Sequence, residues 1–314
     1  MELIRDARSL QSIHKGCIAT IGTFDGIHLG HQAVLRQVVN KSIKLKLPSV
    51  VIVFEPLPGE YLSPAHAPAR LMSFREKFYS IGSQGIDRLL TLTFNEKLKT
   101  MSANQFVEDI FVNGLGVKHL VFGDDFRFGN NREGDFAFTK RLGNANNFAV
   151  FPTATVEFEG ERISSTRIRH ALAASDFFLA KSLLGRSYSI SGRVVFGRQM
   201  GRTLGFPTAN LELGRLSSPL SGVYAVKVNG PNMSDVRGVA NIGVRPTVND
   251  NMRANLEVHL LDFDAEIYGQ RIDVTFLSKI REEKKFSSLD ELKANIENDL
   301  RTAHDWFESN PFLN

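Results

Sequence analysis

The sequence has almost no cysteine and no long hydrophobic segment. Cys17 is the single cysteine in 314 residues, which excludes a disulfide within the chain and a metal site built from several cysteines. The longest strand-like apolar run, Val50 to Phe54, ends at Glu55. A helix needs ~20 apolar residues to cross a bilayer. The first ten residues also carry charges where a signal peptide would be apolar. We therefore expect a cytoplasmic protein that has no membrane partner.

A large excess of one charge is also missing. Lysine and arginine total 38 and aspartate and glutamate total 34, so the formal net charge is only +4, and no basic block occurs. This balance does not indicate nucleic acid as a partner. Hydrophobic residues make up 42% of the chain, which is ordinary for a globular protein and excludes a disordered or fibrous one. At ~150 residues per domain, the length predicts about two domains.

The first half alternates short apolar runs with helix-like stretches. The apolar runs are 17–22, 49–54, 87–94 and 118–123. Possible capping boxes at Ser73–Glu76 and at Ser102–Gln105 mark two of the helix starts between them. This alternation predicts an α/β domain with a parallel sheet covered by helices. Ligands of such sheets bind beyond the carboxyl ends of the strands.

The pattern changes near Gly185, after a short helical stretch over 176–184. Between 188 and 276, β-rich runs are separated by glycine, proline and asparagine, which predicts an antiparallel sheet or a small barrel. A helix that begins with a capping box at Ser288 is expected to end the chain. We place the domain boundary at about 185, giving domains 1–185 and 186–314.

The segment 22–31, Gly-Thr-Phe-Asp-Gly-Ile-His-Leu-Gly-His, follows a strand and opens a helix. Its three glycines allow a sharp turn and the close approach of a ligand. His28 and His31 are three residues apart and share a helix face. A helix start already attracts phosphate, and two imidazoles beside it can donate hydrogen bonds to phosphate oxygens. The alternative is a tight turn with two solvated histidines.

Two other segments of the first half could bind ligands. Ser164, Ser165, Thr166 and Arg169 combine hydroxyls with a guanidinium at a helix start and could grip a triphosphate. Taken alone, that segment is better explained as a helix cap with solvated arginines.

The other segment, 123–129, follows a strand. In it, Phe126 and Phe128 could face a flavin or adenine ring, and Asp125 a polar edge of that ring. The alternative is an aromatic cluster under a loop.

The second half carries a glycine-rich and cationic loop at 197–210. Repeated glycines suit a loop whose N–H groups wrap phosphates. Thr208 and Asn210 alternate by two and therefore point the same way on an extended segment. Their hydroxyl and amide oxygens are suitable ligands for Mg²⁺. The loop is not a Walker motif, because no Gly-Lys-Ser/Thr follows.

A carboxylate follows on a predicted strand. Glu257 and His259 alternate by two and lie on one face. Glu257 could accept a proton from a substrate hydroxyl as a general base. On chemistry alone, a solvated strand glutamate is the better explanation.

These motifs together resemble a known family. The segment 22–31 resembles the His-x-x-His signature of the nucleotidyltransferase superfamily, and 163–169 is similar to the Ser-Ser-Thr-x-x-Arg form of FMN adenylyltransferases. In the second half, five segments resemble riboflavin kinase in order and spacing: 206–210, 222–226, 241–247, 257–262 and 280–286. From about residue 15 to 300, the chain resembles the prokaryotic bifunctional riboflavin kinase/FMN adenylyltransferases, also called FAD synthetases.

The resemblance implies a Rossmann-like nucleotidyltransferase domain followed by a β-barrel riboflavin kinase domain. The kinase would phosphorylate riboflavin with Mg-ATP to give FMN. The other domain would transfer AMP from ATP to FMN, which gives FAD and pyrophosphate.

The resemblance also implies roles for single residues. His28 and His31 would act on the transferred phosphate, and Glu257 would be the base for the riboflavin hydroxyl. Thr208 and Asn210 would hold Mg-nucleotide. Phosphate contacts would come from Gly22, Phe24, Asp25, Gly30, Ser164, Ser165, Thr166, Arg169, Gly197, Arg202 and Gly205. Leu57 departs from many relatives, which have histidine or glutamine there, and is given no role.

Two other functions stay open at this point. One is an adenylyltransferase with a single activity, whose second half is a regulatory flavin or nucleotide sensor. The other is a flavin- or RNA-binding protein without catalysis. The sequence makes no prediction of the oligomeric state.

Overall fold

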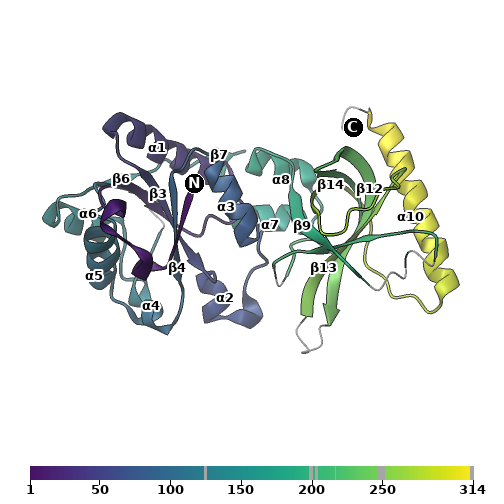
Figure 1. The fold of residues 1–314 in the computed structure, drawn as a ribbon, viewed down its shortest axis with the longest axis horizontal. Helices are drawn as coiled ribbons and strands as arrows, with labels where there is room; N and C mark the ends of the chain where they lie inside the picture. The colour runs from purple at the N-terminus through teal and green to yellow at the C-terminus, as the bar shows by residue number, and fades with distance from the viewer. Residues whose placement is uncertain (124–125, 198–200, 202–203, 216, 247–251, 312–314) are drawn as a thin grey trace. The chain divides into compact units, whose positions relative to one another are not determined.

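The chain forms two compact units in the computed structural model. The structure describes residues 1–123, 126–197, 201, 204–215, 217–246 and 252–311 (Figure 1). One unit comprises Met1–Pro68 and Phe74–Ser164, and the other comprises Ala69–Ser73 and Ser165–Asn314. Residues 165–184 therefore pack with the second unit. The predicted boundary at about 185 concerns which residues serve each activity, and it stays a prediction.

The first unit is built on a six-stranded sheet in which every pair of neighbouring strands is parallel. The strand order is β1-β4-β3-β2-β5-β6. The strands are β1 (Glu2–Arg5), β2 (Ile18–Ile21), β3 (Ser49–Glu55), β4 (Arg88–Thr93), β5 (His119–Phe122) and β6 (Ala149–Pro152). This confirms the predicted α/β fold. The edge strands β1 and β6 were not predicted, because four residues give too short a pattern to read.

Helices flank this sheet and a small hairpin follows it. The helices are α1 (Leu29–Leu45), α2 (Pro58–Leu62), α3 (Phe74–Gly82), α4 (Glu96–Thr100), α5 (Ala103–Phe106), a π-helix (Val107–Gly114) and α6 (Phe136–Ala145). Short 3₁₀ turns occur at Ala7–Ser9, Ser12–His14, Pro64–His66 and Asn130–Arg132, and the hairpin is β7 (Glu157–Phe158) and β8 (Glu161–Arg162). Helix α1 packs against β2, β3 and β5, directly after the turn that carries the histidines.

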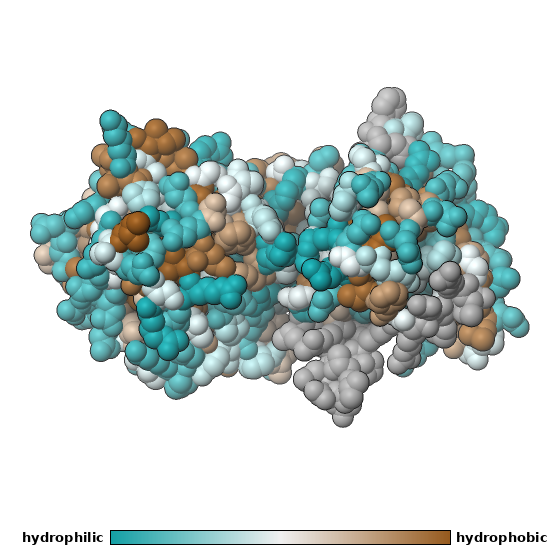
Figure 2. All heavy atoms as spheres, in the orientation of Figure 1, coloured by the Kyte–Doolittle hydropathy of each residue, from teal (hydrophilic) through white to brown (hydrophobic). Residues whose placement is uncertain are grey.

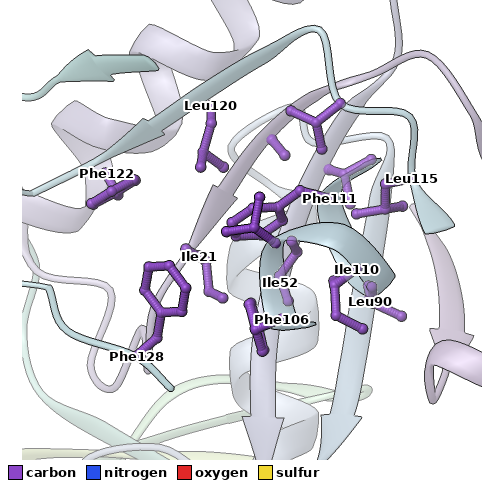
Figure 3. Close-up of a cluster of buried hydrophobic side chains, with 14 of the residues drawn as sticks. Ile21, Ile52, Leu90, Phe106, Ile110, Phe111, Leu115, Leu120, Phe122 and Phe128 are labelled. Atoms are coloured by element: carbon purple, nitrogen blue, oxygen red, sulfur yellow. The ribbon is translucent and has the colours of Figure 1, made fainter. Parts of the chain in front are cut away.

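The main core of this unit lies on one face of the sheet. Ile21, Ile52 and Leu90 come from three adjacent strands and meet Phe106 and Phe111 from the helices that cover them (Figure 3). Because strand side chains alternate, Ile18 and Thr20 of β2 lie on the opposite face. Both are completely buried. The two faces of β2 are therefore both covered, as expected for a central parallel strand.

The second unit is a closed barrel of six strands in the order β10-β13-β12-β11-β14-β9, all paired antiparallel. The strands are β9 (Ser189–Val195), β10 (Ala209–Glu212), β11 (Gly222–Gly230), β12 (Met233–Pro246), β13 (Met252–Leu260) and β14 (Arg271–Arg281). The helices α7 (Ser165–Ala173) and α8 (Phe177–Leu184) precede the barrel, and α10 (Leu289–Ser309) follows it. The predicted barrel and terminal helix are both confirmed.

Helix α10 begins at the predicted residue with a modified cap. The Ser288 hydroxyl accepts a hydrogen bond from the Glu291 backbone N–H at 3.1 Å. The Glu291 carboxylate, however, accepts hydrogen bonds from Ser287 and from Lys284. Hydrogen bonds from Lys284 and then from Ser287 lower the pKa of Glu291 to about 2. The carboxylate therefore ties the preceding loop to the first turn of the helix.

Most large apolar side chains lie inside the two units. On the face shown in Figure 2, hydrophobic residues form small patches between hydrophilic ones. Among the described residues, no helix combines the length and the hydrophobicity that crossing a membrane requires.

Candidate functional sites

The turn between β2 and α1 has an unusual backbone. Phe24 and Ile27 have φ angles of 47° and 42°, and Gly26 has a φ of 92°. Positive φ is uncommon outside glycine and is a clear outlier for a β-branched residue. Phe24 and Ile27 are buried, so packing holds them in this conformation. Strained backbone of this kind concentrates at functional sites.

The two predicted histidines are in direct contact. His28 is the N-cap of α1, and its Nδ1 accepts a hydrogen bond from the His31 backbone N–H at 3.2 Å. The two imidazole rings stack with their centroids 3.6 Å apart and an angle of 17° between their planes. Because Nδ1 of His28 is an acceptor, the hydrogen of a neutral imidazole at this position would be on Nε2.

His31 is held in its neutral form. Burial lowers its pKa well below the ordinary value, and electrostatic repulsion from the neighbouring basic groups of His28, Lys77 and Arg162 lowers that pKa further. Lys77 and Arg162 are cationic side chains, whose charge an anionic ligand would neutralise.

Lys77 anchors the turn and was missed by sequence reasoning. Its side chain is almost fully buried, and Nζ donates a hydrogen bond to the Thr23 carbonyl oxygen at 2.7 Å. A signal was present, because Phe74, Lys77, Phe78 and Ile81 share the apolar face of α3. A lysine on such a face needs a polar partner inside the protein.

A cavity opens beside this turn, at the carboxyl ends of β2 and β5. It is lined by Thr20, Ile21, Gly22, Thr23, Phe24, Gly30, His31, Val34, Phe122, Gly123, Phe126, Thr153, Ala154, Thr155, Val156, Arg162 and Ile163. Gly22, Phe24, Gly30, His31 and Phe126 are thus predicted site residues that the structure brings together. Arg162 was not predicted, because it stands in a short hairpin with no recognisable pattern.

Other predicted residues of the first unit lie elsewhere. Asp25 and His28 are buried and are not among the lining residues, although the His28 ring stacks on His31, which is. Phe128 is buried in the core, where its ring centroid is 5.2 Å from that of Phe106. Asp125 falls outside the described residues. The aromatic segment therefore divides, with Phe126 at the cavity and Phe128 in the core.

The segment around Ser164 is shared between the units. Ser164 ends the first unit, and Ser165 and Thr166 begin α7 in the second. Nε of Arg169 donates a hydrogen bond to the Ala69 carbonyl oxygen at 2.6 Å. The phosphate-binding roles of these residues stay predictions, whereas Arg162, just before them, does line the cavity.

A second cavity lies in the barrel unit. One of its lining residues, Glu257, has asparagine neighbours on its own strand and on both adjacent strands. On β13, Glu257 is directly opposite Asn210 of β10 on one side and Asn241 of β12 on the other. Directly paired residues project on the same face. The Asn255 amide also donates a hydrogen bond to the Glu257 carboxylate at 3.3 Å. Asn241 was not predicted as a site residue, because only strand register brings it beside Glu257.

The glycine loop packs on the predicted metal-binding residues. A side chain at Gly197 would collide with the Asn210 amide, and one at Gly201 would collide with the Phe206 carbonyl oxygen and contact the Thr208 hydroxyl. Gly205 is exposed with a φ of 89°. Arg202 lies outside the described residues. Position 197 therefore requires glycine, because any side chain there would occupy the space of the Asn210 amide.

His259 supports the same segment. One of its ring nitrogens, Nδ1, lies 2.7 Å from the Pro207 carbonyl oxygen and donates a hydrogen bond to it. The Phe206 ring meets the imidazole edge-on, with 6.0 Å between the centroids. His259 thus holds the backbone immediately before Thr208.

Helix α10 provides an apolar wall to the barrel cavity. The complete lining is Gly201, Leu204, Phe206, Thr208, Val223, Val239, Asn241, Glu257, His259, Arg281, Glu283, Lys284, Phe286, Leu292, Ile296, Asp299 and Leu300. Asp299 of α10 accepts two hydrogen bonds from Arg281, both at 2.7 Å. This pair fixes the helix to the end of β14. The cavity therefore has one polar side, around Glu257, and one apolar side.

Comparison with known proteins gives matches over both units. A family model described as FAD synthetase matches residues 10–167, and one described as riboflavin kinase matches 184–307. The bifunctional riboflavin kinase/FMN adenylyltransferase of Pseudomonas fluorescens is 50% identical over 303 residues, covering 96% of this chain and 97% of that protein. The protein of the same name from Escherichia coli K12 is 47% identical over 308 residues, covering 98% of each.

A solved structure is also similar over its whole length. It is described as a macrolide-efflux protein from Streptococcus pneumoniae, with a TM-score of 0.79 and 31% identity over 98% of this chain and 100% of that one. Its description names a different activity from those of the relatives above. The matches to both family models and to the curated relatives confirm the resemblance that the motifs indicated, including its enzymatic character.

Proposed function

We propose that this chain, which belongs to the family of bifunctional riboflavin kinase/FMN adenylyltransferases, makes FAD from riboflavin in two ATP-dependent steps, one in each unit. The observation that supports this best is the presence of two cavities, of which one is lined by His31 and Gly30 of the first motif and the other by Thr208 and Glu257 of the second. Neither cavity contains the motif residues of the other reaction. Each step is therefore assigned to its own unit.

The first unit would transfer AMP to FMN. A phosphate oxygen of FMN attacks the α-phosphorus of ATP, a new P–O bond forms, and the bond to pyrophosphate breaks. The imidazoles of His28 and His31 and the backbone N–H groups of the first turn of α1 would stabilise the charge on the transferred and leaving phosphates. Phe126 offers a ring face for the flavin or the adenine.

The second unit would phosphorylate riboflavin. Glu257 accepts the proton of the 5′-hydroxyl while that oxygen attacks the γ-phosphorus of ATP, and ADP leaves with the electron pair of the broken P–O bond. The isoalloxazine ring would lie on the apolar side of the cavity, formed by Val223, Val239, Phe286, Leu292, Ile296 and Leu300. A polar base and an apolar slot in one cavity match the two ends of riboflavin.

The second site fits a magnesium ion by the chemistry of its donors. Thr208, Asn210 and Glu257 supply hydroxyl, amide and carboxylate oxygens, the hard donors that Mg²⁺ prefers. Strand register places Asn210 directly opposite Glu257. We propose that Thr208 and Asn210 hold Mg²⁺ together with the nucleotide phosphates, where the ion would neutralise phosphate charge.

A cytoplasmic location also stays a prediction.

One experiment tests the function. The purified protein is incubated with riboflavin and Mg-ATP, and the flavins are separated by chromatography. We expect riboflavin to convert first to FMN and then to FAD. FAD from supplied FMN, but no FMN from riboflavin, would instead indicate a single adenylyltransferase with a regulatory second unit. Absence of both products would exclude catalysis.

A further inference from the structure

The central strand β2 carries a buried hydroxyl without a partner. Thr20 is completely buried, and its Oγ1 makes no hydrogen bond within the described part of the chain. Buried polar groups in folded proteins are nearly always hydrogen-bonded, so each exception calls for an explanation. At a site, the usual explanation is a ligand that completes the bonding.

The same cavity contains a second buried polar atom of this kind. His31 Nδ1 is buried and makes no hydrogen bond to any described residue. Thr20 and His31 both line the cavity of the first unit, which opens at the carboxyl end of β2. Thr20 projects from the face of β2 opposite the core shown in Figure 3, which is the face that α1 covers. Two polar side chains therefore reach one cavity with their bonding incomplete.

The sheet itself supplies a comparison. Thr91, on β4, also has a buried Oγ1 without a hydrogen bond among the described residues. Thr91 does not line the cavity. Both residues are β-branched threonines in the same parallel sheet, so they differ mainly in access to the site. Thr91 is therefore the matched control for Thr20.

We propose that Thr20 is a substrate-binding residue of the adenylylation site, whose hydroxyl, together with Nδ1 of His31, hydrogen-bonds the nucleotide. This inference rests on the proposed function of the first unit. A hydroxyl can both donate and accept, so it can pair with a ribose hydroxyl, an adenine nitrogen or a phosphate oxygen. The nucleotide is the partner because its phosphates are assigned to the start of α1, where His31 lies in the same cavity lining as Thr20, whereas Phe126, with its ring face, lies in the loop after the neighbouring strand β5.

The test compares threonine-to-valine variants at the two positions. Thr20→Val removes the hydroxyl and keeps a β-branched side chain of similar volume. In the FMN-to-FAD reaction, we expect the KM for ATP to rise ~5- to 50-fold, the range for one lost hydrogen bond to a polar or charged ligand. The inhibition constant of α,β-methylene-ATP, an analogue that cannot release pyrophosphate, should rise by the same factor. Thr20→Ser should restore most of the affinity, and Thr91→Val should leave both constants unchanged.

Several outcomes would overturn the proposal. They are an unchanged affinity for ATP in Thr20→Val, a rise in the KM for FMN alone, a fall in kcat alone, and an equal effect of Thr91→Val. If Thr20→Val does not fold by circular dichroism, Thr20→Cys provides the same comparison with a much weaker donor. The proposed function fails separately: if the wild-type protein makes no FAD from FMN, the adenylylation site itself is wrongly assigned.

Discussion

The stacked pair of His28 and His31 depends on one hydrogen bond that also starts α1. Nδ1 of His28 caps the helix through the His31 N–H, which orients the first ring against the second. Lys77 holds the preceding turn through Thr23. Single side chains thus determine both the fold of the turn and the direction in which the imidazoles can donate.

The first prediction concerns both histidines. In a His28→Ala/His31→Ala variant we expect FAD formation from FMN to be abolished and FMN formation from riboflavin to be kept. Loss of one such donor elsewhere costs about 2.7–4 kcal/mol of transition-state stabilisation, so a double loss should be severe. Flavin chromatography of both half-reactions measures this. A folded double variant with near wild-type FAD formation would show that the site is wrongly assigned.

The second prediction concerns pH and stability. The lowered pKa of His31 keeps it neutral in the fold, whereas the unfolded chain takes up a proton below a pKa of about 6.5. The unfolded state therefore binds more protons, and the first unit should lose stability as the pH falls from 7.5 to 5.5. His119, whose pKa is also lowered by burial, should add to the loss.

Hydrogen exchange of peptides from β2 and β3 at the two pH values measures this loss. His31→Gln should reduce the difference between the two pH values, and the exposed His66→Gln serves as the control for removing a histidine. An identical pH dependence in wild type and His31→Gln would contradict the prediction.

The third prediction concerns Glu257. Glu257→Gln keeps the shape of the side chain and removes the proton acceptor. We expect riboflavin phosphorylation to fall ~10²-fold or more, as is usual for loss of a general base. Adenylylation of supplied FMN should persist, because its chemistry is assigned to the other unit. Both half-reactions are measured on one preparation, and an unchanged kinase turnover would remove Glu257 from the mechanism.

Two helices of the first unit have glycine as their second residue, in different surroundings. A Cβ at Gly30 of α1 would lie 3.1 Å from both Nδ1 and Cε1 of His28. A Cβ at Gly59 of α2 would meet only Pro68, at 3.8 Å, which is ordinary contact. A methyl group at position 30 would therefore press on the His28 imidazole, whereas one at position 59 would make only ordinary contact.

The fourth prediction follows from this difference. Gly30→Ala should lower FAD formation ~10-fold, because the methyl group displaces the His28 ring and misplaced catalytic groups lose rate steeply. Gly59→Ala is the matched control and should leave activity unchanged. Alanine is the better helix former, so Gly59→Ala should not lower stability, and circular dichroism checks that both variants fold. Equal activity in the two variants would mean that the His28 ring tolerates the extra methyl group.

At the scale of the whole molecule, the short segment 69–73 belongs to the second unit, although the rest of that unit begins only at residue 165. Ala69–Ser73 packs with the second unit, although the residues on both sides of it belong to the first. Nη1 of the buried Arg215 donates hydrogen bonds to the Leu71 carbonyl oxygen at 3.2 Å and to the Tyr188 hydroxyl at 3.2 Å. The Tyr188 hydroxyl also donates to the Leu71 oxygen, at 3.1 Å. The barrel unit is therefore not complete without 69–73.

The fifth prediction tests this segment. Arg215→Met should lower the thermal unfolding midpoint of the barrel unit in the full chain, because hydrogen bonds of a buried charged group are worth about 1.5–3 kcal/mol each. In a fragment 165–314, which lacks the Leu71 carbonyl, the same substitution should have a much smaller effect. Fluorescence of Trp306, the single tryptophan, reports on this unit. Equal shifts in chain and fragment would show that the 69–73 segment does not stabilise the barrel.

Local patterns in the sequence were enough to predict both folds and the start of each site. The central strands, the helix that begins at the histidines, the barrel and α10 depend on periodicity and caps within a few residues. The histidine pair, the glycine loop and Glu257 could be found for the same reason, since the chemistry and the spacing lie in one segment. The short strands β1 and β6 and the hairpin β7–β8 were not predicted, because segments of two to four residues give no periodicity.

The tertiary structure alone decided which distant side chains join these segments. Strand register placed Asn241 and Asn210 on either side of Glu257. Packing divided two phenylalanines of one segment, Phe126 at a cavity and Phe128 in the core. It also brought Lys77 to Thr23. The physical reason is that these contacts depend on register and burial between elements far apart in the chain, which no local pattern encodes.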